Sequence, residues 1–129
     1  MISIDTFPNA PGSVTKARYL VTDALRSFPQ EVRDSVETLL SELATNCVRH
    51  TSSEFTVRID TAADKIRVDV TDSGPGTPRI ESPPLSEPAG RGLRIVDLLA
   101  DRWGIISDDP SFDKTVWFEI ANRPGTRSD

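Results

Sequence analysis

Three short stretches of the chain carry residue types that together suit a nucleotide. Glu42 and Asn46 stand four residues apart, the segment 72–76 reads Asp-Ser-Gly-Pro-Gly, and the segment 90–93 reads Gly-Arg-Gly-Leu. The first stretch offers a carboxylate and an amide, and the second offers a carboxylate followed by glycines. In the third stretch, the glycines leave backbone N–H groups at the start of a helix available to bind phosphate. In this order the three stretches predict a nucleotide-binding site.

Each polar residue has a chemistry of its own. The amide oxygen of Asn46 can ligate Mg²⁺, which keeps several waters and is usually shared with substrate phosphates. Glu42 beside a phosphate cleft is a candidate general base for a hydroxyl nucleophile. Asp72 at a strand end can accept from the exocyclic amine of adenine, which favours ATP over GTP. The alternatives are a solvated helix carboxylate for Glu42, a backbone-bonded Asn46 and a simple Asx-type turn at Asp72.

The glycines supply backbone rather than side chains. Gly74 and Gly76 would let the main chain approach the base and ribose closely. Gly90 and Gly92 lead into a helix, whose free N–H groups and dipole favour a phosphate. Arg91 adds a positive charge there, and Leu93 begins the apolar face of that helix.

Apolar residues at helical spacing predict a helix over about 30–50, with Glu42 and Asn46 at the edge of its apolar stripe. A preceding helix carries apolar residues from Val14 to Phe28, with Ser13 as its N-cap. A third helix over 92–101 is expected to turn Leu93, Val96, Leu99 and Ala100 inward. Alternating residues predict further strands at 2–7, 55–59, 66–70, 103–107 and 115–120. The fold class expected is α+β: a two-layer sandwich with a mixed, mostly antiparallel sheet of about five strands and three helices on one face.

The trio of motifs resembles the N, G1 and G2 boxes of the GHKL (Bergerat-fold) ATPase and kinase superfamily. The chain is most similar to the stand-alone bacterial anti-sigma-factor serine/threonine kinases. The resemblance implies ATP and Mg²⁺ as cofactors, Glu42 as the catalytic base, Asn46 at the metal and Asp72 at adenine. It implies that 77–89, a proline-rich segment without periodicity, is the ATP lid. It also implies two partners, a sigma factor and an anti-sigma-factor antagonist, with a homodimer possible.

Composition narrows the class of protein. A chain of 129 residues suits a single domain over 1–129, with a flexible polar tail at 122–129. The net charge of −5 argues against non-specific nucleic-acid binding, which needs clustered positive charge. Cys47 is the sole cysteine, and no apolar run approaches the length of a membrane span, so a cytoplasmic protein is expected.

Two functions stay open at this level. The first is an ATP-dependent protein serine kinase that changes partners with nucleotide and phosphorylation state. The second is a nucleotide-responsive or catalytically silent binding module that sequesters a regulator without phosphoryl transfer. Both need the adenine pocket, and only the first needs Glu42.

Overall fold

The computed structural model describes residues 1–50, 53–72, 95–106 and 114–122, except the side chain of His50. Its centre is one five-stranded sheet in the order β1-β2-β3-β5-β4. The strands are β1 (Ile2–Phe7), β2 (Phe55–Thr61), β3 (Lys65–Asp72), β4 (Arg102–Ile106) and β5 (Lys114–Ala121). All four pairings are antiparallel, so the sheet is more uniform than the mixed one expected.

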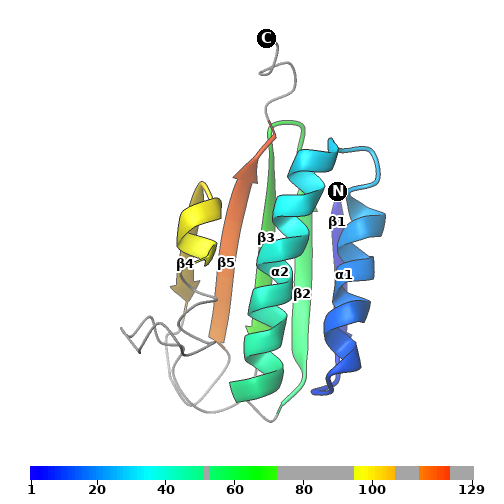
Figure 1. Cartoon of the computed structure of the whole chain (residues 1–129), viewed down its shortest axis with the longest axis vertical. Helices are drawn as coiled ribbons and strands as arrows, with labels where there is room; N and C mark the ends of the chain where they lie inside the picture. Colours follow the sequence, from blue (N-terminus) through cyan, green and yellow to red (C-terminus); the bar gives the residue numbers. More distant parts are fainter. Residues whose placement is uncertain (51–52, 73–94, 107–113, 123–129) are drawn as a thin grey trace.

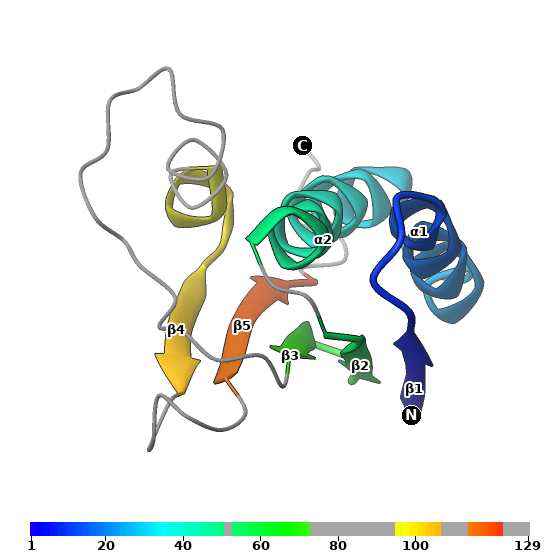
Figure 2. The same ribbon diagram turned by 90° about the horizontal axis from the view of Figure 1, so that it is seen from below.

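The helices of the described residues all cover the same face of this sheet. Helices α1 (Gly12–Ala24) and α2 (Gln30–His50) lie side by side over it, and a third helix, described over 95–99, lies above β4 (Figure 1). Figure 2 shows these helices on the same side, so no helix of the described segments lies on the other face. The expected two-layer α+β sandwich is confirmed.

The core lies between the helices and the sheet because side chains alternate along each strand. In β2 and β3 every second residue is buried, from Phe55 to Ile59 and from Ile66 to Val70. These side chains pack against the fully buried stripe of α2, which contains Val36, Leu39 and Leu40. The stripe therefore fixes the rotation of α2 about its axis, and with it the placement of Glu42 and Asn46.

Ion pairs and a cation–π contact with the ring of Trp117 lie on the uncovered face of the sheet. The guanidinium of Arg67 stacks 4.3 Å from the ring centre of Trp117. Glu119 next to it is only 8% exposed and pairs with Lys65, Arg67 and Arg102 at 3.7–3.8 Å. Trp117 thus belongs to the uncovered face and not to the core or the nucleotide site.

Two expectations about the helices were wrong. Ser13 does not cap α1, because the helix starts one residue earlier with Pro11 as its N-cap and no side-chain cap bond. The Ser13 hydroxyl instead donates to the carbonyl of Pro8 at 2.7 Å. In the third helix Val96 is fully buried as expected, but Leu99 is 45% exposed, because the described helix ends there and the chain turns into β4.

Candidate functional site

Helix α2 brings the carboxylate and the amide of the first motif to the edge of the covered face. Leu43, Ala44 and Cys47 are buried under the helix, whereas Glu42 and Asn46 are half-buried beside them. Within the described part of the chain neither polar side chain forms a hydrogen bond or an ion pair. Residues four apart stack on one helix surface. Both side chains are therefore placed to meet a ligand that lies along this edge.

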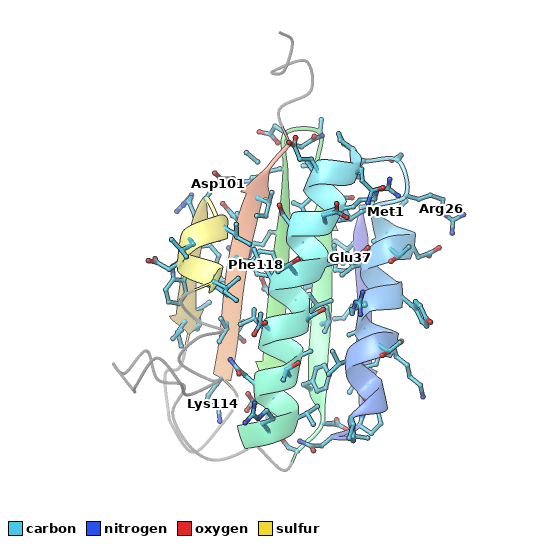
Figure 3. The ribbon with its side chains drawn as sticks, in the orientation of Figure 1. Met1, Arg26, Glu37, Asp101, Lys114 and Phe118 are labelled. Atoms are coloured by element: carbon cyan, nitrogen blue, oxygen red, sulfur yellow. The ribbon has the colours of Figure 1, made fainter. Side chains whose placement is uncertain are left out.

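Asp72 is the last residue of β3, and its register fixes what surrounds it. Its Cα is paired with Phe55, the first residue of β2, and with Lys114, the first residue of β5. Side chains of register partners in neighbouring strands point to the same face of a sheet. Asp72 and Lys114 thus sit together at one end of the sheet, on the face that α2 covers. Figure 3 shows Lys114 at this end, at the start of β5.

The two residues form a buried ion pair. Nζ of Lys114 lies 3.0 Å from Oδ1 of Asp72, with the side chains 5% and 13% exposed. Burying a charge is costly unless an opposite charge compensates it, and removing one partner strands the other. The pair therefore holds the Asp72 carboxylate in place at the end of β3.

Cys47 joins the first motif to the second. Its thiol donates to Oδ2 of Asp72 across 3.8 Å, a long but acceptable distance for sulfur. The pKa of the Cys47 thiol is raised from 9.0 to about 12, mainly by burial and further by the charge of Asp72 and the hydrogen bond to it, while the charge of Lys114 acts in the opposite direction. The thiol is thus protonated at neutral pH. Since Asn46 precedes Cys47, this contact places the Asn46 turn of α2 beside the end of β3.

Asn9 holds the end of α2 from the other side. Its side-chain amide donates to the carbonyls of Cys47, at 3.2 Å, and of Ser53, at 3.3 Å. Carbonyls in the last turn of a helix have no partner within the helix, so a side-chain donor there is stabilising. Asn9 therefore links the loop after β1 to both sides of the connection between α2 and β2.

Some residues of the predicted site lie outside the described residues. They are Gly74, Gly76, Gly90, Arg91, Gly92 and Leu93, together with the segment 77–89. The structure thus joins the turn of α2 that carries Asn46 to Asp72 through Cys47, and Glu42 lies one helical turn before Asn46 on α2. These residues and Lys114 are called the cluster below.

Lys114 and Asn9 were missed by the sequence analysis. Lys114 stands just before the alternating run that predicts the last strand, where a lysine suggests a loop. Its only signal is that β5 starts opposite the end of β3, and that register is a long-range property. Asn9 stands in a loop between two prolines, which predicts a turn and no particular partner.

The donors near Asn46 fit a magnesium ion that is bound mostly through its substrate. Among the described residues, no group of three His, Cys, Asp or Glu side chains is arranged to hold a metal. Mg²⁺ held with a nucleotide needs only one or two protein oxygens, because phosphates and waters fill the other positions. The half-buried amide of Asn46 satisfies that requirement.

No helix among the described residues is long and apolar enough to cross a membrane.

Solved structures share this fold. The RsbU and RsbW domains of Rv1364c from Mycobacterium tuberculosis superpose with a TM-score of 0.73 and 16% identity, over 96% of this chain and 33% of that chain. Histidine kinase AdeS of Acinetobacter baumannii superposes with a TM-score of 0.54 and 12% identity, over 95% of this chain and 69% of that chain. The histidine kinase domain of the blue-light activated histidine kinase EL346 from Erythrobacter litoralis superposes with a TM-score of 0.53 and 18% identity, over 89% of this chain and 61% of that chain. The chain thus spans about a third of the Rv1364c structure.

At sequence level, no curated protein matches the chain significantly. A family model described as histidine kinase-like ATPase domain matches residues 7–119. That range starts at the last residue of β1, ends within β5, and includes Glu42, Asn46 and Asp72. Because the match extends over most of the chain and over the residues that form the cluster, this chain belongs to the family of histidine kinase-like ATPase domains.

Proposed function

We propose that the chain is an ATP- and Mg²⁺-dependent protein serine kinase that acts as an anti-sigma factor. In this proposal it binds a sigma factor and phosphorylates a serine on an anti-sigma-factor antagonist. The observation that carries the proposal is the position of Asp72, which Lys114 holds at the end of β3 and Cys47 joins to the helix turn that carries Asn46. A base reader and a phosphate-side ligand are thereby held at a fixed separation.

Asp72 reads the base in this account. A buried carboxylate accepts a hydrogen bond from the exocyclic amine of adenine. Guanine has a carbonyl in the corresponding position, so the same site would face two acceptors with no proton between them. A site that leaves a buried polar group unpaired discriminates strongly against the wrong ligand. ATP is therefore the expected nucleotide.

The α2 side chains serve the phosphate end. Mg²⁺ bound with ATP would neutralise charge on the phosphates, and Asn46 would supply it with an amide oxygen. Glu42, one helical turn away, would accept the proton of the attacking serine hydroxyl. The half-buried setting of Glu42 suits this role, because a partly buried carboxylate is less hydrated than one on an open helix face.

The choice of a regulatory kinase over a sensor kinase rests on the similar structures. The TM-score for the RsbU and RsbW domains of Rv1364c, 0.73, exceeds the values for the two histidine kinases, 0.54 and 0.53. A shared fold supports many functions, so we use this difference as support for the partner class and for nothing finer.

Radiolabel transfer tests the proposal. The chain is incubated with γ-labelled ATP, Mg²⁺ and a candidate antagonist encoded beside it, and label on the antagonist is measured. Label should appear on wild-type antagonist and not on a variant whose acceptor serine is replaced by alanine. ATP binding without any transfer would favour the binding-module alternative, and absence of ATP binding would contradict both functions.

A further inference from the structure

Lys114 is the least expected residue of the cluster. Lysine is almost never fully buried unless it is paired, yet this side chain is 5% exposed at the first position of β5. Phe118 and Ile120, which also occupy the covered face of β5, are buried apolar residues. An apolar side chain at 114 would pack there without the cost of desolvating an ammonium group.

The position of the ammonium group suggests a function that would explain why a charge is buried here. Nζ lies 3.0 Å from Oδ1 of Asp72, while the thiol of Cys47 lies 3.8 Å from Oδ2. An ammonium group has three N–H donors and no acceptor, and a carboxylate has only acceptors. The end of the sheet therefore presents one acceptor and one cationic donor side by side.

That pattern matches one edge of adenine. The exocyclic amine of adenine is a donor, and the adjacent ring nitrogen N1 is an acceptor. We propose that Lys114 is a second base-reading residue, which donates to N1 of adenine while Asp72 accepts from the exocyclic amine. This inference rests on the ATP site proposed above and assigns the base selectivity to two residues instead of one.

Guanine in the same orientation would be rejected twice. Its carbonyl would face the Asp72 carboxylate, and its N1–H would face the Lys114 ammonium, so both contacts would become repulsive. A carboxylate alone is a weaker filter, because guanine can shift slightly and donate its N1–H to that carboxylate. In the proposed orientation the Lys114 ammonium, 3.0 Å from Oδ1 of Asp72, would lie where such a shifted contact would be made.

The direct test compares two ligands on the wild-type chain. Calorimetric titration in Mg²⁺ would measure the affinity for ATP and for 1-deaza-ATP, in which a C–H group replaces N1. We expect 1-deaza-ATP to bind about 10- to 100-fold more weakly, the range for losing a hydrogen bond to a charged donor. Equal affinities would overturn this inference and leave the ATP site intact. If neither binds, the proposed function falls, and this inference with it.

Variants separate base reading from support of Asp72. Lys114→Gln keeps a donor and should retain preference for ATP over 1-deaza-ATP, whereas Lys114→Met should bind the two within about threefold of each other. Lys65→Met is the matched control, since Lys65 begins β3 at the opposite end of the same strand pair and has its own carboxylate partner, Glu119. It should behave as wild type. A Lys114→Met chain that still prefers ATP by the wild-type factor would overturn the inference, and the wild-type comparison decides even if that variant fails to fold.

Discussion

The thiol of Cys47 lies 3.8 Å from Oδ2 of Asp72 and ties the C-terminal half of α2 to the end of β3. The contact joins two sequence motifs that are 25 residues apart along the chain. It also places a thiol beside the carboxylate that we propose binds adenine. Its behaviour therefore reports on the integrity of the site.

Cys47 should be unreactive in the folded chain. Its side chain is buried, and its pKa is raised to about 12, so the thiolate that attacks alkylating reagents is scarce at pH 8. We expect labelling by iodoacetamide at pH 8 to be limited by opening of the structure and to accelerate in denaturant. Labelling of the native chain as fast as a free cysteine would contradict the burial of this contact.

The same thiol gives the free energy of unfolding an alkaline dependence. In the unfolded chain it loses its proton near the ordinary value of 9.0, whereas in the folded chain it keeps the proton until about 12. Its contribution is thus fully present below pH 9 and is lost as the pH rises toward 12. Urea unfolding from pH 8 to 11 should show wild type losing stability relative to Cys47→Ala, and a constant difference would contradict it.

Gly104 should tolerate no side chain. A Cβ built on it would lie 3.0 Å from Nε1 of Trp117, its register partner in β5, and 3.1 Å from two further ring atoms. Gly104→Ala should therefore lower the free energy of unfolding by about 1–3 kcal/mol, the usual cost of overpacking. The control is Gly12→Ala at the start of α1, where a Cβ would have no heavy atom within 4 Å and should cost almost nothing. Equal urea midpoints for the two variants would show that the Trp117 ring moves aside.

ATP with Mg²⁺ should raise the melting temperature, and Asp72→Asn should abolish most of the increase. Ligand at 100 times its Kd stabilises the folded state by about 2.7 kcal/mol, which shifts a domain of this size by several degrees. GTP should give little shift. Each chain is compared with its own unliganded melting temperature, because Asp72→Asn also strands the Lys114 charge and should cost about 3 kcal/mol.

The control for this experiment is Asp69→Asn. Asp69 lies three residues before Asp72 in the same strand, on the uncovered face, where it pairs with Arg67 at 2.8 Å. It should respond to ATP as wild type does. Equal shifts of the wild-type chain with ATP and with GTP would refute the assignment of Asp72 to adenine.

Local patterns predicted most of the fold because each covered element has a clear period. Alternation placed β2 and β3 within one or two residues of their bounds, and the helical stripe placed α2 over 30–50. Register could not be predicted in the same way. The pairing of Asp72 with Lys114 depends on how β5 slides along β3, which hydrogen bonds across the sheet and packing under α2 decide together.

The third helix ends earlier than helical spacing predicts. Helical spacing assigned Leu99 to the core because it lies three residues after Val96. The described helix ends at that residue, and the backbone N–H of Asp101 already bonds to the carbonyl of Glu119 in β5. A periodic pattern cannot reveal where a helix gives way to a strand, so Leu99, near the end of the pattern, was placed on the wrong side.

The central claim is that one turn of α2 separates metal binding from chemistry, and two variants test it in one assay. Asn46→Ala should lose the Mg²⁺-dependent part of ATP affinity and all transfer. Glu42→Ala should bind ATP nearly as wild type but transfer label to the antagonist about 10²- to 10⁴-fold more slowly, the usual scale for a positioned base. Because both side chains are only half-buried, each substitution should leave the free energy of unfolding almost unchanged. Transfer by Glu42→Ala at the wild-type rate would contradict the account.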